Sequence, residues 1–395
     1  MNILYLCDEY PPCQHGGIGT VTQTLARSLA KKGHTVVVAG FYPYYRKAVE
    51  NENDNGVNVY RFFYGSKLLL QFSKRNFLGR FINIENQFNK YIIYLKKIII
   101  ENKIEIIESP DFLEAFRYSG PSMIQYPTFG IPFIVKLHGS YTIVNDYSKD
   151  NFGHANIQIK EQNLLNFANG LVAVSDSVKE RVEERFRIFN KIYVLYNGVL
   201  VAKDIKYQPN LTKDNVVFAG TLSESKGVFN LIKAWDKVIQ VRPSAQLLLY
   251  GKGSSITISA INKLIKYNIK SSIILMGYIE REHLPSIFAN AACAIFPSFA
   301  ETFGMAPIEA MATGCPTIFT KRTSGPEIIE NGVDGLLIDP NDEQEIADAI
   351  LMLLTNRELA FEIGQNGINK VRSNFDIDII AEKHISFYEG FLQKY

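Results

Sequence analysis

The stretch CAIFPSFAETFGMAPIEAMATGCPTIFT, residues 293–320, contains two short apolar runs on either side of a segment rich in Ala and Met. The runs CAIFPS (293–298) and PTIFT (316–320) have the composition of strands that are covered on both faces. Apolar runs that alternate with helical segments are typical of a parallel sheet. This stretch therefore predicts a strand, a helix and a second strand parallel to the first.

The same alternation extends in both directions along the chain. We expect further strands at residues 2–9, 34–42, 57–63, 104–110, 132–140, 170–176, 192–198, 216–220, 245–251, 272–277 and 335–340. The polar segment 199–215 has no clear period and has the composition of a linker. The sequence therefore predicts an α/β protein with two doubly wound, Rossmann-like domains, at residues 1–205 and 206–376. The amphipathic helix at about 377–395 is expected to join the first domain.

Composition and charge are those of an ordinary globular protein. The chain has 395 residues, 47% of them hydrophobic, and a net charge of +2, which does not favour nucleic acid as a partner. The four cysteines have no zinc-type spacing, and the start MNILYLCDEYPP has no basic n-region of a signal peptide. No uncharged apolar run approaches the ~20 residues of a membrane span. We therefore expect a cytoplasmic protein.

Residues 66–103 give the protein a second expected location, the inner face of the cell membrane. This segment carries eight Lys and Arg residues against two Glu residues, with Leu and Phe between them. Basic side chains near an anionic surface contribute about 1 kcal/mol each, and apolar ones can insert. The alternative is the solvated face of ordinary helices.

Two glutamates in the opening stretch are candidates for a binding site. Glu301 precedes the expected helix and Glu309 lies two turns inside it, about 12 Å further along the helix axis. Carboxylates accept hydrogen bonds from hydroxyl groups, so the pair fits the two hydroxyl-bearing ends of a ligand such as a nucleoside-diphosphate sugar. The alternative is that Glu301 stabilises the helix N-terminus and Glu309 is a surface residue.

Lys226 is a candidate for binding phosphate. It follows the expected strand 216–220 and stands beside Gly227 at the start of the next helix. A helix N-terminus has free N–H groups and a partial positive charge, and Lys226 adds a full charge. The alternative is an exposed lysine beside a turn glycine.

Together these stretches resemble the family 4 retaining glycosyltransferases, which have the GT-B fold. The segment ETFGMAPIEAMATGCPTI (301–318), followed by SGPEIIENGVDGLLIDPND (324–342), is similar to the signature of that family. SESKG (223–227) resembles its lysine turn, and HGGIGTVTQTLARSLAKKGHTVVV (15–38) resembles the beginning of its first domain. The resemblance implies two Rossmann-like domains that face a central cleft. It also implies transfer of a sugar from a nucleoside-diphosphate donor to a hydroxyl acceptor, with retention at the anomeric carbon.

The resemblance also implies roles for single residues. Glu301 would bind hydroxyls of the donor sugar, His138 would lie near the reacting sugar, and Lys226 would bind the diphosphate. These three would be the catalytic residues, and Glu309 would hold the ribose. The donor would contact a wider set: Gly16, Gly17, Lys226, Tyr278, Ile279, Glu301, Phe303, Gly304, Met305, Glu309 and Arg322. In this set the paired glycines would close over the donor, and the Tyr–Ile pair would flank the base.

One position departs from the family pattern. The family commonly has Arg five residues before the lysine, where this sequence has Thr221. Arg322, on the turn after strand 316–320, is the expected substitute because its planar group can bond two phosphate oxygens. We expect no metal and no other cofactor, because the Asp-x-Asp pair at Asp376 and Asp378 is far in sequence from these turns.

Two other functions fit the same architecture. Thr221 favours a non-catalytic nucleotide-sugar binding protein, and a sugar-nucleotide epimerase would act without an acceptor. An NAD-dependent dehydrogenase is disfavoured because neither half has G-x-G-x-x-G at its first turn. We expect the acceptor to be a glycan or a lipid-linked molecule, and the setting to be synthesis of cell-surface polysaccharide or glycolipid.

Overall fold

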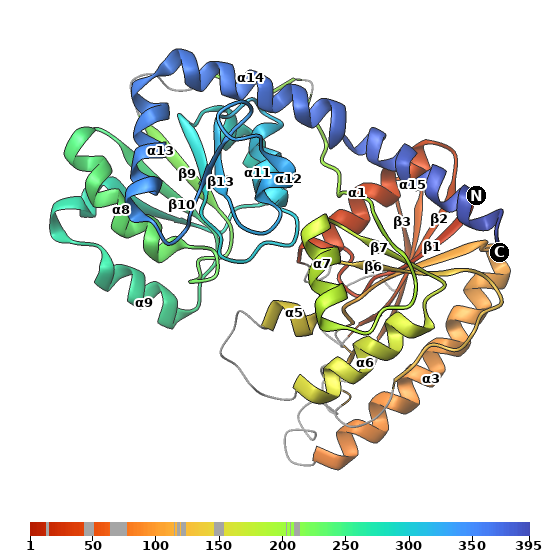
Figure 1. Ribbon diagram of the computed structural model, residues 1–395. Helices are drawn as coiled ribbons and strands as arrows, with labels where there is room; N and C mark the ends of the chain where they lie inside the picture. The colour runs from red at the N-terminus through yellow and green to blue at the C-terminus, as the bar shows by residue number, and fades with distance from the viewer. Residues whose placement is uncertain are drawn as a thin grey trace. The chain divides into compact units, whose positions relative to one another are not determined.

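The computed structural model describes residues 1–12, 16–42, 51–63, 77–113, 115–116, 119, 124–145, 154–202, 204–205, 207–208 and 214–395. It divides into two compact units, Met1–Gly198 together with Ile377–Tyr395, and Val199–Asp376 (Figure 1). The boundary expected after residue 205 lies a little further along the chain than the observed one. Each unit contains a largely parallel sheet with helices, so the α/β prediction is confirmed. That the two units face each other across a cleft stays a prediction.

The sheet of the first unit has the strand order β3-β4-β2-β1-β5-β6-β7-β8. Its strands are β1 (Asn2–Leu6), β2 (Thr35–Tyr42), β3 (Asn51–Asp54), β4 (Val57–Phe63), β5 (Ile106–Pro110), β6 (Phe133–Leu137), β7 (Gly170–Ala173) and β8 (Ile192–Val194). β3 and β4 form an antiparallel hairpin, whose turn residues Asn55 and Gly56 both have positive φ, 51° and 91°, as a tight hairpin turn requires. The sequence did not predict β3, because its residues NEND offer no apolar face.

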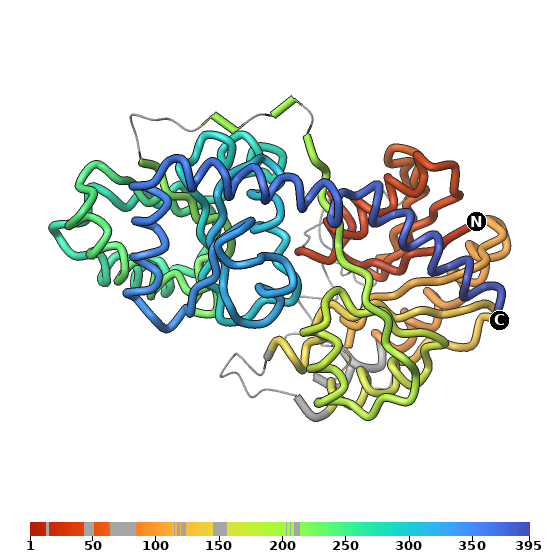
Figure 2. Tube along the Cα trace, turned by 45° about the horizontal axis from the view of Figure 1, so that its top comes forward, coloured from red at the N-terminus to blue at the C-terminus, as the bar shows by residue number. Residues whose placement is uncertain are grey.

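The helices of the first unit include one from the end of the chain. They are α1 (Gly17–Lys31), α3 (Phe77–Glu101), α5 (Tyr141–Asn145), α6 (His154–Phe167), α7 (Asp176–Arg185) and α15 (Ile377–Leu392). α15 runs beside α1 (Figure 2), and Ser28 on α1 donates a hydrogen bond to Asp378 on α15. The buried hydroxyl of Tyr388 on α15 donates to Oε2 of Glu108 at 2.6 Å and lies 3.0 Å from the hydroxyl of Tyr5. These buried contacts with β5 and β1 explain why the last helix belongs to this unit.

The sheet of the second unit is parallel, with the strand order β11-β10-β9-β12-β13-β14. Its strands are β9 (Asn215–Ala219), β10 (Gln246–Tyr250), β11 (Ile273–Gly277), β12 (Cys293–Phe296), β13 (Thr317–Thr320) and β14 (Leu336–Ile338). The expected strands around residues 293–320 are β12 and β13, and they are parallel. The direction of strand addition reverses between β9 and β12, and ligands of such sheets bind beyond the carboxyl ends of the strands at this switch point.

Helices connect these strands and bury the core of the second unit. They are α8 (Val228–Val241), α9 (Ser255–Leu264), α10 (Leu284–Ala289), α11 (Met305–Met311), α12 (Gly325–Ile328), α13 (Glu343–Thr355) and α14 (Arg357–Asn374), with the short 3-10 helices η1 (Tyr267–Ser272) and η2 (Arg281–His283). α8 contributes the buried Trp235 to the core, and its indole N–H donates to Ser272 at 3.0 Å. In the part of the chain that the structure describes, no helix is both long and apolar enough to cross a membrane.

Candidate active site

The loops that follow β9 and β12 are bonded to each other at the switch point of the second unit. The amide of Phe299 in the β12 loop donates to the carbonyl of Ser225 in the β9 loop at 2.9 Å. Gly227 has a φ of +72°, and a Cβ atom there would lie 1.8 Å from the carbonyl oxygen of Pro297. Glycine is therefore required at this position, because any side chain would separate the two loops.

This contact brings Lys226 and Glu301 together. The ammonium of Lys226 donates to Oε2 of Glu301 at 2.6 Å, and the two side chains keep 29% and 18% of their surface exposed. A partly exposed cation beside a partly exposed carboxylate can bind an anion and a hydroxyl-bearing group side by side. Both residues were predicted from the sequence, but their direct pairing was not.

Glycine and serine fix the backbone that leads into α11. Gly304 has a φ of +97°, and a Cβ atom there would lie 2.8 Å from the ring of Phe319. The side chain of Phe303 is buried in the core, and its carbonyl accepts a hydrogen bond from Ser324 at 2.9 Å. Met305 is half-buried at the first position of α11. The ring of Phe303 therefore packs in the core and does not reach the surface of this loop.

Glu309 is paired with an arginine that sequence reasoning missed. Arg281 belongs to η2, which follows β11, and its Nε atom and one terminal guanidinium nitrogen both donate to Oε1 of Glu309. Only 13% of the Glu309 side chain is exposed, so it is not an ordinary surface residue. The signal that could have revealed Arg281 is its position on the loop after a parallel strand, three residues beyond Tyr278.

Tyr278 and Lys252 lie together on the loops after β11 and β10. The ammonium of Lys252 lies 3.8 Å from the centre of the Tyr278 ring, and the Tyr278 hydroxyl donates to Glu280 at 3.0 Å. Tyr278 is 52% exposed, and Ile279 beside it is half-buried. Lys252 was not predicted. An exposed aromatic ring next to a cation is a surface on which a flat ligand group can stack.

Arg322 is engaged on the other side of the switch point. Its guanidinium donates to Oδ1 of Asp339 at 3.0 Å and lies 5.8 Å from the centre of the Phe299 ring. Thr221 is exposed on the β9 loop. We predicted that Arg322 replaces the arginine missing at position 221, and this stays a prediction. It requires that Arg322 leave Asp339 when it binds a phosphate.

The first unit places its predicted residues on two loops at carboxyl ends of strands. Gly16 is the N-cap of α1, and its amide donates to Glu9 at 3.0 Å; Gly17 begins the helix. His138 follows β6 and is half-buried. Burial and the nearby charge of Lys136 lower the pKa of His138 to about 3, so its imidazole is neutral near pH 7.

Two carboxylates that the sequence analysis did not select hold the His138 loop. The carboxylate of Asp111 accepts hydrogen bonds from the amides of His138, Gly139 and Ser140 at 2.9, 3.1 and 2.7 Å. Glu161 accepts from the amide of Tyr141 at 2.6 Å. Burial raises the pKa of Asp111 to about 6 and that of Glu161 to about 7. The loop is therefore fixed by acids that titrate near neutral pH.

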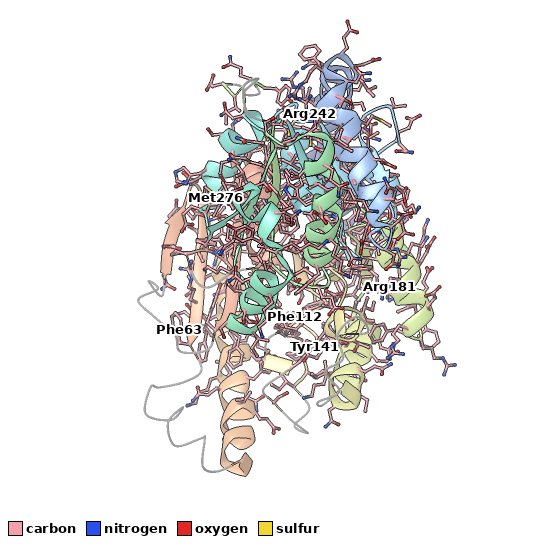
Figure 3. The ribbon with its side chains drawn as sticks, turned by 90° about the vertical axis from the view of Figure 1, so that its left-hand side faces the viewer. Phe63, Phe112, Tyr141, Arg181, Arg242 and Met276 are labelled. Carbon is pink, nitrogen blue, oxygen red and sulfur yellow. The ribbon has the colours of Figure 1, made fainter. Side chains whose placement is uncertain are left out.

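Aromatic side chains lie close to the loops of the first unit. Phe112, directly after Asp111, stacks on Tyr141 with the ring centres 6.0 Å apart (Figure 3).

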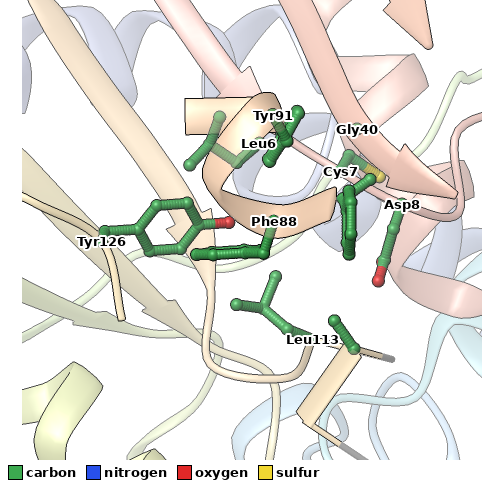
Figure 4. A pocket seen from close by; sticks show the side chains of 10 residues that line it. Leu6, Cys7, Asp8, Gly40, Phe88, Tyr91, Leu113 and Tyr126 are labelled. Atoms are coloured by element: carbon green, nitrogen blue, oxygen red, sulfur yellow. The ribbon is translucent and has the colours of Figure 1, made fainter. Parts of the chain in front are cut away.

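A small pocket lies where β1 and β2 end, and Figure 4 shows Asp8 and Tyr126 on opposite sides of it with the ring of Phe88 between them. Its walls are formed by Leu6, Cys7, Asp8, Gly40, Phe41, Phe88, Tyr91, Leu113, Ala115 and Tyr126. The pocket is lined mainly by apolar side chains.

The side chains described do not form a metal site. Within the described ranges, no group of three or more His, Cys, Asp or Glu residues is arranged to hold an ion. Asp378 accepts a hydrogen bond from Ser28 and lies in the first unit, whereas Asp376 lies in the second. The Asp-x-Asp sequence is therefore divided between the two units.

Comparisons with known proteins agree with this geometry. The family model for glycosyl transferases group 1 matches residues 202–370, and the model for glycosyltransferase family 4 matches residues 15–203. An uncharacterized glycosyltransferase of Methanocaldococcus jannaschii, MJ1607, is 24% identical over 98% of this chain and 98% of its own length. The capsular polysaccharide biosynthesis glycosyltransferase CapM of Staphylococcus aureus is 27% identical over 58% of this chain and 63% of its own length.

A solved structure shows the same fold. The structure of Anabaena HepE in complex with UDP and glucose superposes with a TM-score of 0.74, at 19% identity over 98% of this chain and 99% of that one. The two parallel-sheet units, the two matching family models and this likeness define the class: the protein is a glycosyltransferase with the GT-B fold. The chain belongs to the family 4 glycosyltransferases.

Proposed function

We propose that this protein transfers a sugar from a nucleoside-diphosphate sugar to a hydroxyl acceptor with retention at the anomeric carbon. The observation that carries the proposal is the contact between Lys226 and Glu301 at the switch point of the second unit. It joins the two chemical groups that a sugar diphosphate needs, a cation for the phosphates and a carboxylate for the sugar hydroxyls. Neither group is buried, so both are available to a donor.

The reaction breaks the bond between the anomeric carbon and the diphosphate oxygen and forms a bond to the acceptor oxygen on the same face of the sugar. The proton of the acceptor hydroxyl passes to the leaving diphosphate. Negative charge develops on the leaving diphosphate. Fixed positive charge at that point stabilises the transition state more than the ground state. We assign this role to Lys226, with the backbone amides at Phe303–Met305 as further donors. No metal is part of this proposal.

The two glutamates of the opening stretch serve different ends of the donor. Glu301 faces the β9 loop through Lys226, and Glu309 faces the β11 loop through Arg281. The sugar and diphosphate would lie at the first of these contacts, and the ribose and base at the second, next to Tyr278. The complex of Anabaena HepE with UDP and glucose, a protein of the same fold, supports this choice of donor.

The first unit would receive the acceptor. His138, neutral and held by Asp111, would lie near the reacting sugar, and Gly16 and Gly17 would close over the donor. The likeness to CapM supports an acceptor that is a glycan or a lipid-linked glycan, in synthesis of cell-surface polysaccharide or glycolipid. This setting is compatible with the proposed contact of residues 66–103 with the inner face of the membrane.

A donor panel tests the proposal. The purified protein is mixed with UDP-, ADP-, GDP- and CDP-sugars, and the unfolding temperature is measured; a ligand at 100 times its Kd adds about 2.7 kcal/mol. The stabilising donor is then incubated with glycan acceptors, with and without EDTA, and the anomeric configuration of the product is determined by NMR. Retention of configuration and full activity in EDTA are expected. Inversion would overturn the retaining assignment, and loss of activity restored by Mg²⁺ would overturn metal independence.

A further inference from the structure

The contact between Arg281 and Glu309 is asymmetric. Both nitrogens of Arg281 that contact Glu309 donate to the same carboxylate oxygen, Oε1. The second oxygen, Oε2, receives no hydrogen bond from any residue that the structure describes. Arg281 therefore fixes the direction of the carboxylate and leaves one of its oxygens available.

The surroundings of this pair restrict its motion. The Glu309 side chain is 13% exposed and that of Arg281 is 35% exposed. A long arginine side chain that is partly covered and bound through two nitrogens has already lost much of its rotational freedom. The available oxygen of Glu309 is thus held in place before a ligand arrives, and preorganised acceptors bind a hydroxyl more strongly than mobile ones.

We propose that Arg281 is a positioning residue that makes the enzyme select ribonucleotide donors over 2′-deoxyribonucleotide donors. Arg281 holds Glu309 so that its available oxygen accepts a hydrogen bond from a ribose hydroxyl. A site built to bind a hydroxyl rejects an analogue that lacks it, because the buried acceptor is then left without a partner. This inference rests on the proposed function, in which Glu309 binds the ribose.

A purely structural role is the competing explanation. Arg281 could simply connect η2 to α11, in which case its loss would weaken all nucleotides equally or lower stability alone. The chain offers a matched control in the same unit. The Nε atom and one terminal nitrogen of Arg242 both donate to Oδ2 of Asp214, at 3.0 and 2.6 Å. Arg242 follows α8 and Asp214 precedes β9, so this pair lies at the amino end of the strands.

The experiment measures how well each variant distinguishes two nucleotides. UDP, ADP and GDP are titrated into the wild-type protein by calorimetry, and the one that binds most tightly is paired with its 2′-deoxy analogue. The ratio of the two Kd values is then determined for the wild type, for the single variants Arg281→Met, Arg281→Lys, Glu309→Gln and Arg242→Met, and for the double variant Arg281→Met/Glu309→Gln. Circular dichroism confirms that each variant is folded.

We expect the wild type to bind the ribonucleotide about 10-fold more tightly, in line with the loss of one hydrogen bond to a charged group. Arg281→Met should bring the ratio of the two Kd values close to 1, with little change in the Kd of the deoxy analogue. Arg281→Lys should have a ratio between those of Arg281→Met and the wild type. The Kd ratio of the double variant Arg281→Met/Glu309→Gln should be no lower than that of Glu309→Gln alone. Arg242→Met should keep the wild-type ratio.

Three results would overturn the inference. An unchanged ratio in Arg281→Met, or equal weakening of both nucleotides, makes Arg281 a structural residue and leaves the proposed function intact. A wild-type protein that binds both nucleotides equally rejects the inference in the same way. If the wild type binds none of the nucleoside diphosphates, the proposed function fails together with the inference. If Arg281→Met does not fold, Arg281→Lys and Glu309→Gln still test the inference. Both variants must then have a lower Kd ratio than the wild type.

Discussion

The ammonium of Lys226 lies 2.6 Å from Oε2 of Glu301, although the two residues are 75 positions apart in the sequence. They meet because β9 and β12 are neighbours in the sheet while β10, β11 and their helices lie between them in the chain. In the absence of a ligand each side chain is the other's partner. A donor must therefore replace an ion pair with its own phosphates and hydroxyls, and variants of either residue should report on donor use.

Glu301→Ala should lower turnover by roughly 10²-fold, as the loss of one transition-state contact does. Glu309→Ala should mainly weaken donor binding, because its contact is made equally in the ground state. Initial rates over a range of donor concentrations separate the two effects. Glu343→Ala is the control, because Glu343 at the start of α13 is also paired with a lysine. Its Oε1 atom lies 3.6 Å from Nζ of Lys233. Kinetics in both site variants that match this control would reject the assignment.

Arg322→Ala should reduce both donor affinity and turnover, because Lys226 alone cannot offset the charge of a diphosphate. Adding Thr221→Arg should restore part of the loss by placing a cation on the β9 loop. Donor binding and rates are measured for the two single variants and the double, with Lys321→Ala as the neighbouring control. If Arg322→Ala behaves like Lys321→Ala and the wild type, Arg322 is only a surface charge held by Asp339.

Stability should fall between pH 5 and pH 7.5 because of Glu161. Burial raises the pKa of Glu161 from 4.5 to about 7, so the folded state keeps a proton that the unfolded state has already lost. The group stabilises the fold fully below about pH 4.5, and this contribution, up to about 3 kcal/mol, is lost as the pH rises through 7. Urea unfolding of the wild type and Glu161→Gln at several pH values measures it. If the free energy of unfolding changes with pH in the same way in the wild type and in Glu161→Gln, the prediction is contradicted.

His138 should contribute no titration to the reaction between pH 5 and pH 8. Burial and the charge of Lys136 lower its pKa to about 3, so the imidazole stays neutral over this range. The pH–rate profiles of the wild type and His138→Asn should therefore have the same shape, although the variant is slower at every pH. A limb near pH 6.5 that disappears in His138→Asn would show that the side chain takes up a proton during turnover.

The exposed face of α3 should bind anionic membranes. Ile93 and Ile100 are 70% and 76% exposed on this helix, and the exposed Lys90, Lys96 and Lys97 lie between and beside them. The exposed Lys103 follows just after the end of the helix. The wild type should sediment with anionic vesicles more than with neutral ones, and Lys96→Glu/Lys97→Glu should lose this preference. The control is Lys263→Glu/Lys270→Glu in the second unit. Equal binding to both vesicle types, or no binding to either, would contradict the prediction.

Part of the proposed membrane segment lies outside the described residues. Residues 64–76 lie outside the described residues, as do the side chains of residues 77–83. The basic and apolar residues that the sequence analysis placed there therefore stay a prediction. Only the part of the segment within α3 supports the vesicle experiment.

The parallel strands could be predicted from the sequence because a strand buried on both faces leaves a local run of apolar residues. Apolar runs such as CAIFPS are strands in the structure, and the loops after them carry Lys226 and Glu301 as expected. The polar strand β3 was missed because its residues are half exposed and carry no apolar period. What identifies it is the Asn55-Gly56 turn, a signal of only two residues.

The partners of the site residues were less predictable. Arg281 reaches Glu309 from a loop 28 positions away, and Asp111 binds the His138 loop from the end of the neighbouring strand. Such contacts depend on which strands are neighbours and on the rotamers of long side chains. Neither is encoded in a local pattern, so candidates for a site could be predicted from the sequence but the contacts between them could not.

The helix α15 has a consequence for how the chain acquires its structure during synthesis. Glu108 on β5 is buried, and the hydroxyl that donates to it belongs to Tyr388, on the last helix. The second unit is one continuous segment and can complete itself as soon as it leaves the ribosome. The first unit must wait for that whole segment to be translated, which at about 5–20 residues per second takes roughly ten seconds or longer. During that interval its central strands carry a carboxylate without its phenolic partner, so the half that is translated first is the half that is finished last.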